Sequence, residues 1–65
     1  MRISDLRERL TLSFGARWAP SFCKDIAITE LGSKSVDEAL NGGLEPHEIW
    51  RAVCAAYPNE TLKHR

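Results

Sequence analysis

Residues 35–54 read SVDEALNGGLEPHEIWRAVC and say more about the architecture than any other part of the chain. Ser35 and Glu38 have the S-x-x-E spacing of a capping box, in which each side chain satisfies the other residue's free backbone N–H at a helix start. Glycines 42–43 end that short helix. Pro46 suits the first position of a second helix, because an N–H there would have no partner. The stretch therefore predicts a helix-turn-helix-like αα-hairpin.

Helical patterns also fill the rest of the chain, and no strand pattern competes with them. Ser4 is a good N-cap for a helix that ends at Gly15. A second helix is predicted from Trp18 to Leu31, with Pro20 in its first turn. The sequence thus predicts an all-α protein, a compact three- to four-helix bundle that contains the αα-hairpin.

Two groups of side chains define the faces of the helix predicted over residues 18–31. A large apolar stripe lies beside a row of small residues that would let a neighbouring helix approach closely. The stripe is Trp18, Phe22 and Ile26, and the small residues are Ala19, Cys23 and Ala27. The helix that begins at Pro46 has a wide apolar face, which indicates a central position or an interface. Residues 1–58 are predicted to form a single helical domain, and residues 59–65 a frayed C-terminal tail.

The length of the chain, 65 residues, predicts one core and no reaction chamber. A domain of this size buries only about 60% of the surface that its unfolded chain exposes. Most of the large apolar side chains are then needed for the core, which disfavours an enzyme and a bound cofactor. Self-association relieves a shortage of burial, so we expect a monomer or a weak homodimer.

The charges balance overall but are unevenly distributed. Nine basic and nine acidic residues give a formal net charge of zero, which disfavours a protein that depends on non-specific phosphate contacts. Residues 1–24 carry five basic and two acidic side chains, whereas residues 25–62 carry two basic and seven acidic ones. This uneven distribution favours ion pairs between the first helix and the later helices within the fold. The alternative is that it orients a charged partner.

The start of the chain and its cysteines indicate a compartment. Residues 1–5 are charged and lead into no apolar segment of a secretory signal, and no apolar run is long enough to span a membrane. We therefore expect a cytoplasmic protein, where thiols stay reduced. Cys23 and Cys54 both lie in apolar helical patterns, which predicts two free core cysteines without a disulfide. The sequence assigns them no redox role.

The residues that could carry chemistry are poorly spaced for it. His47 and Cys54 are seven residues apart in one helix, about 10 Å along the axis, which is too far for a thiolate–imidazole hydrogen bond. A zinc site could draw on these two residues with Cys23 and His64, but no close ligand pair such as C-x₂-C is present. We expect no catalytic residues and no metal.

The αα-hairpin can also be interpreted as a helix-turn-helix that binds nucleic acid. The positions where a helix-turn-helix motif needs a small residue, a turn glycine and two inward apolar residues are filled by Ala39, Gly43, Leu44 and Ile49. Any tight pair of helices needs the same residues, however, and two carboxylates near the second helix start would repel phosphates. His47 and Arg51 are the donors left for a base edge, so nucleic-acid binding is the alternative function.

A protein–protein contact is the function that the sequence favours. Trp50 is predicted near the edge of the apolar face that follows Pro46, and Trp and Arg are enriched at binding hot spots. The candidate partner-binding residues are Trp50, Arg51, Arg7 and Arg9. Trp50 packed in the core and the arginines on a solvated helix face are the competing interpretation. The partner is an unknown protein.

Several of these motifs together resemble a known family. They are Met1-Arg2-Ile3, Phe14-Gly15, Leu31-Gly32, Ser35-Val36-x-x-Ala39-Leu40, Gly43-x-x-Pro46 and Ile49-Trp50-Arg51-Ala52-Val53-Cys54. They resemble a small actinobacterial family of unknown function whose members have about this length, and W-R-A-V-C is its most specific run. Ile26 departs from that family's pattern, where a polar residue, often histidine, follows Asp25. The resemblance implies a cytoplasmic bacterial protein, and the position of the family's genes near those of the recombinase RecA and its regulator RecX implies an association with DNA repair.

Overall fold

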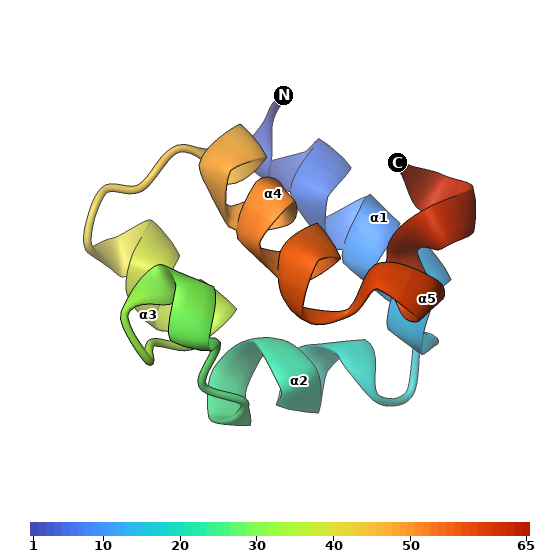
Figure 1. Cartoon of the computed structure of the whole chain (residues 1–65), viewed down its shortest axis with the longest axis horizontal. Helices are drawn as coiled ribbons and strands as arrows, with labels where there is room; N and C mark the ends of the chain where they lie inside the picture. Colours follow the sequence, from blue (N-terminus) through green and yellow to red (C-terminus); the bar gives the residue numbers. More distant parts are fainter.

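The computed structural model describes all 65 residues and is helical almost throughout (Figure 1). It contains five α-helices, two 3₁₀ turns and no strand, so the all-α class is confirmed. The elements are α1 (Ile3–Phe14), α2 (Ala19–Asp25), η1 (Thr29–Leu31), α3 (Val36–Asn41), α4 (Pro46–Ala56), α5 (Pro58–Thr61) and η2 (Leu62–His64). In Figure 1, α4 crosses in front of α1, with α2 below, α3 to the left and α5 to the right.

The first helix begins earlier than the sequence predicts. It starts at Ile3, and Arg2 rather than Ser4 occupies the N-cap position. The Asp5 carboxylate accepts a hydrogen bond of 2.9 Å from the Arg2 backbone N–H. The Asp5 carboxylate thus makes the N3-to-N-cap half of a capping box, and no serine cap forms at Ser4. Gly15 ends the helix with φ of +88°, which L side chains rarely adopt.

The second helix is shorter than predicted, because the chain leaves it after Asp25. Ile26 is extended, and the backbone N–H of Ile28 donates to the Lys34 carbonyl at 3.0 Å. The short loop between them contains η1 and closes at Gly32 in the left-handed conformation. The loop buries Ile28 and Leu31 in the core. A continuous helix over 18–31 is therefore wrong, since core packing and β-branched isoleucines favour the extended path.

The capping box and the proline start are confirmed. The Ser35 N–H donates to the Glu38 carboxylate at 3.1 Å, and the Glu38 N–H donates to the Ser35 hydroxyl at 3.2 Å. Gly43 has φ of +91° in the turn that follows α3. Pro46 is the first residue of α4.

Replacing Ser35 by alanine is expected to lower the free energy of unfolding by about 1 kcal/mol, because the Glu38 N–H loses its acceptor at a helix start. Urea denaturation followed by circular dichroism measures the change. Exposed Ser33 is a matched control, and Ser33→Gly is expected to be neutral or slightly stabilising because Ser33 has φ of +64°. An unchanged midpoint for Ser35→Ala would contradict the role of the box.

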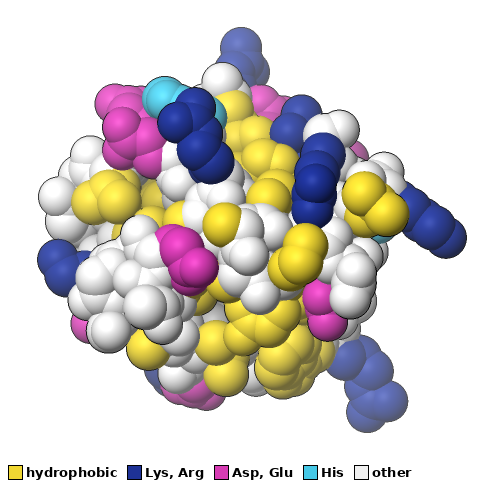
Figure 2. Space-filling view, in the orientation of Figure 1, with side chains coloured by type: hydrophobic (Ala, Val, Ile, Leu, Met, Phe, Trp, Pro, Cys, Tyr) yellow, Lys and Arg dark blue, Asp and Glu magenta, His cyan; other side chains and the backbone are white.

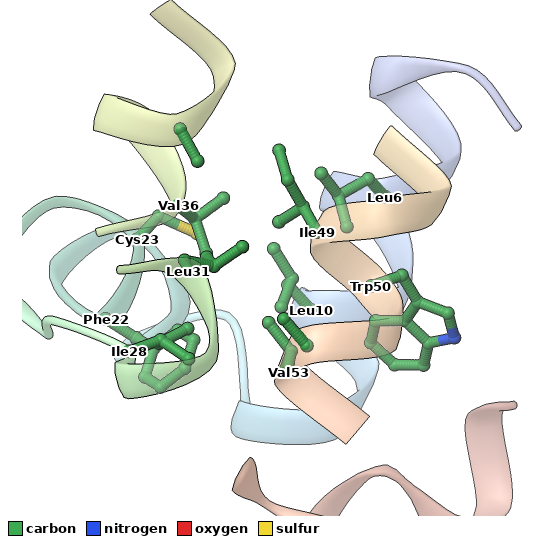
Figure 3. Close-up of a cluster of buried hydrophobic side chains, with 12 residues drawn as sticks. Leu6, Leu10, Phe22, Cys23, Ile28, Leu31, Val36, Ile49, Trp50 and Val53 are labelled. Carbon is green, nitrogen blue, oxygen red and sulfur yellow. The ribbon is translucent and has the colours of Figure 1, made fainter. Parts of the chain in front are cut away.

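The core lies between α1 and α4 on one side and α2, η1 and α3 on the other (Figure 3). Helix α4 contributes four buried residues, more than any other element, which fits the central position predicted for it. The core cluster consists of Leu6, Leu10, Phe22, Cys23, Ile28, Leu31, Val36, Ala39, Ile49, Trp50, Ala52 and Val53.

The last residues are folded rather than frayed. Pro58 stops α4 as predicted, but it then begins α5, which packs on α1. Thr61 is fully buried, and its hydroxyl donates to the Tyr57 carbonyl at 2.8 Å. The Arg65 guanidinium donates to the Pro58 carbonyl at 2.9 Å. The structure thus differs from the frayed tail predicted over residues 59–65. The sequence does not predict this helix, because a proline and one threonine are weak signals in a polar stretch.

Candidate binding surface

Trp50 lies in the core and does not form an exposed edge. Its side chain comes from α4 and borders the buried cluster in Figure 3, and the residue is only 6% exposed. The guanidinium carbon of Arg9 lies 5.8 Å from the centre of the indole ring, within the range of a cation–π contact. The interpretation of Trp50 as a docking residue is therefore wrong, since its ring is packed and capped by another predicted contact residue.

Arg7 joins α1 to α3. Its guanidinium forms an ion pair of 3.3 Å with the Asp37 carboxylate, and both side chains are about half exposed. This is the one ion pair of the structure, and it links the basic first part of the chain to the acidic remainder as the charge distribution favours. An exposed pair of this kind contributes about 0–1 kcal/mol, so Arg7 can change partners at little cost.

His47 and Arg51 lie one turn apart on α4, and both are exposed. Figure 2 shows a histidine beside a Lys or Arg side chain over the start of α4. Arg51 shares a shallow surface depression with Glu30 and Glu48. The two carboxylates reduce the positive potential that a nucleic-acid contact requires.

No three histidine, cysteine, aspartate or glutamate side chains come together as metal ligands would. Cys23 is buried and Cys54 half-buried, and both are free thiols. None of the helices has the length and apolar character needed to cross a lipid bilayer.

A small hollow opens between α1 and α2. Its volume is about 150 Å³, and six residues line it: Arg7, Leu10, Thr11, Ala19, Pro20 and Cys23. We call it the α1–α2 hollow. The small side chains of Ala19 and Cys23, which the sequence suggests would bring two helices together, instead leave space beside Leu10. Arg7 is the one charged residue of the lining, and no carboxylate belongs to it.

Trp18 is a large exposed aromatic residue. It immediately precedes Ala19, which lines the hollow. Trp18 is the N-cap residue of α2, just before its first turn, and the residue is 45% exposed. Its ring packs against Phe14 at 5.8 Å and Phe22 at 5.3 Å between centroids. Figure 2 shows hydrophobic atoms gathered over the first turn of α2. The predicted inward stripe is thus buried at Phe22 and open at Trp18.

The pKa of the Cys23 thiol depends on its burial and on the charged residues around the hollow. Burial raises its pKa above the ordinary value, the Asp37 carboxylate raises it further, and the Arg7 guanidinium acts in the opposite direction. A raised pKa leaves less of the thiol as the reactive thiolate at a given pH.

Replacing Asp37 by asparagine is expected to shift the pH–rate profile of Cys23 alkylation to lower pH. Removing the carboxylate lowers the pKa of the thiol, so more of the reactive thiolate is present at a given pH. Reaction with iodoacetamide in a Cys54→Ser background measures the profile, and Arg7→Gln is expected to shift it the other way. Asp25→Asn removes an exposed carboxylate two residues from Cys23 that does not influence its pKa, and an equal shift in this control would contradict the assignment.

Comparisons with known proteins place the chain in a family without an assigned activity. A search of curated proteins and a search of solved structures each found no significant match. The sequence model of one family, described as "Protein of unknown function (DUF3046)", matches residues 1–60. That match covers nearly the whole chain and agrees with the resemblance seen in its motifs, so this protein belongs to the DUF3046 family of unknown function.

Proposed function

We propose that this protein is a small non-enzymatic binding module that contacts another protein through the open side of α1 and α2. This contact face consists of the α1–α2 hollow and Trp18. The observation that carries the proposal is a tryptophan, 45% exposed, that immediately precedes Ala19 of a preformed hollow in so short a chain. Arg7 remains part of the surface, whereas Trp50 and Arg9 do not.

Tryptophan supports a contact role because it offers a large, rigid area at small entropic cost. Four other large apolar residues are also exposed, namely Met1, Ile3, Leu12 and Leu62. Trp18 differs from them because two aromatic rings fix its position in the free protein. A residue that is already held in place loses little freedom when a partner covers it.

The size of the hollow suits one side chain of a partner better than a whole small molecule. Pockets that enclose small molecules usually measure about 300–1,000 Å³, and this hollow is about 150 Å³. It can receive one side chain of a larger partner. The two free thiols fit a reducing compartment, so the proposal includes the cytoplasm. A monomer or a weak homodimer is the expected state before the partner binds.

Site-specific photo-crosslinking in the source cells tests the contact face. A benzophenone amino acid at Thr11, on the rim of the hollow, is expected to give one discrete adduct, and adding Trp18→Ala is expected to remove it. The same photoreactive residue at exposed Asn59 and the equally apolar surface change Leu62→Ala serve as controls. The proposal fails if Thr11 gives no adduct, or if Trp18→Ala leaves the adduct unchanged in a variant that is still folded.

The alternative function is nucleic-acid recognition by α3 and α4 as a helix-turn-helix-like hairpin, with the DNA-repair association implied by the family resemblance. The exposed pair His47 and Arg51 supports it. Glu48, between them in sequence, and Glu30, which shares the depression with Arg51, weigh against it.

Titration of the protein into labelled duplex DNA over a range of salt concentrations separates the two functions. We expect no binding at physiological salt, because the net charge is zero and Arg51 has acidic neighbours. Affinity that falls steeply as salt rises, together with weaker binding by Arg51→Gln, would replace the contact proposal by the nucleic-acid function.

A further inference from the structure

We propose that the partner segment that enters the α1–α2 hollow is an acidic peptide with one branched apolar side chain. The apolar side chain fills the hollow, and a neighbouring carboxylate pairs with Arg7. This inference rests on the proposed function and specifies the chemistry of its partner.

The dimensions of the hollow determine the anchor. An apolar cavity of about 150 Å³ is large enough for a ring the size of benzene. The α1–α2 hollow has that volume, and half of its lining residues, Leu10, Ala19 and Pro20, are apolar. One leucine-sized side chain fits this space. The rest of the partner must then lie outside it, over Trp18 and the rim.

The charge of the lining determines the flanking groups. Arg7 is the only charged residue of the lining, and its one ion-pair partner is the Asp37 carboxylate of α3, so a carboxylate of the partner can pair with Arg7 in place of Asp37. Lys24 follows Pro20 by four residues and so lies on the same side of α2, and Arg17 immediately precedes Trp18. Acidic residues on both sides of the anchor complement these three cations.

The Arg7–Asp37 ion pair shows how the partner would be held. Asp37 presents a carboxylate from α3 to the same guanidinium that borders the hollow, at 3.3 Å. The Asp37 carboxylate is therefore an internal competitor for the group that the partner needs. Because the pair is exposed and weak, a partner that also gains the apolar contact displaces it. Removing the competitor should strengthen binding.

Three blocked peptides test the chemistry against the full chain. They are Glu-Glu-Leu-Glu-Glu, its serine version Glu-Glu-Ser-Glu-Glu and its basic version Lys-Lys-Leu-Lys-Lys. Amide chemical shifts measure affinity, and protection of Cys23 from iodoacetamide in a Cys54→Ser background reports occupancy of the hollow. The first peptide is expected to bind and to protect Cys23. The serine version is expected to bind more than about tenfold more weakly, because it loses a buried leucine side chain.

Variants of the protein isolate the role of Arg7. Asp37→Asn is expected to tighten binding of the leucine-containing acidic peptide, and Arg7→Gln to weaken it, each by up to about fivefold. Glu8→Gln is the matched control, since it makes the same charge change as Asp37→Asn at an exposed residue beside Arg7 that neither pairs with it nor lines the hollow. Equal tightening by Glu8→Gln would show general electrostatic attraction and would overturn the inference.

Two further results would overturn it. If the basic peptide binds as well as the acidic one, the charge assignment is wrong. If free isovalerate binds as tightly as the acidic peptide, the hollow is a site for a small acid. Photo-crosslinking from Thr11 is independent of all three peptides, so an adduct there without peptide binding refutes the partner chemistry alone. Absence of any adduct from Thr11 in the otherwise unchanged protein refutes the contact face itself.

Discussion

Replacing Phe22 by alanine is expected to lower the free energy of unfolding by about 3–5 kcal/mol. Phe22 is fully buried and stacks on Phe14 with 4.2 Å between ring centroids. Its ring also lies 5.3 Å from those of Trp18 and Tyr57. The residue thus joins α1, α2 and the junction of α4 with α5. A chain of this size has a total stability of roughly 3–10 kcal/mol, so the variant is expected to be largely or wholly unfolded.

Urea denaturation followed by far-ultraviolet circular dichroism measures this effect. Trp18→Ala is the matched comparison, because it removes a ring from the open end of the same cluster. The Trp18 change is expected to cost less than about 1.5 kcal/mol, the value of aromatic pairing in a half-exposed residue. Similar losses for the two variants would mean that Trp18 is a core residue and is unavailable to a partner.

Replacing Trp50 by alanine is the second large change, with an expected loss of about 3–5 kcal/mol. The indole is 6% exposed and packs within the core cluster, and Arg9 lies over its ring. Trp50→Phe should retain more of the stability, because it keeps an aromatic ring beneath the guanidinium. Arg9→Ala should cost about 0.5–1 kcal/mol, as expected for a cation–π contact near the surface.

Fluorescence gives an independent measurement at Trp50. In a Trp18→Phe background, iodide should quench the Trp50 emission weakly, whereas in a Trp50→Phe background it should quench Trp18 strongly. Ready quenching of Trp50, with little loss of stability on its replacement by alanine, would restore Trp50 and Arg51 as a docking edge and would contradict the packing described above.

The sequence predicts those parts of the fold that local chemistry specifies. Ser35 with Glu38, Gly15 and Pro46 act within a few residues of themselves, and each lies where its turn or cap requires it. The length of α2, in contrast, is not specified by neighbouring residues. Ile28 leaves the helix because its side chain reaches the core from an extended backbone, and this depends on residues distant in the sequence.

The binding surface is less accessible to sequence analysis. Periodicity placed Trp50 at the edge of a wide apolar face, and the structure shows that Arg9 from another helix covers it. The spacing predicts Trp18 in the inward stripe of a helix that includes it, whereas α2 begins one residue later. The hollow arises from how Pro20, Ala19 and Cys23 meet α1, and no pattern within one helix encodes the space between two.

The packing of the last helix on the first has a consequence for biosynthesis. Helix α1 is in contact with both α5 and η2, so one side of this helix is covered by residues 58–64, which are far from it in the sequence. Until those residues leave the ribosome, one side of α1 stays uncovered. Docking of residues 58–64 on α1 is therefore expected to be the step that completes the fold, because it joins residues far apart in the sequence.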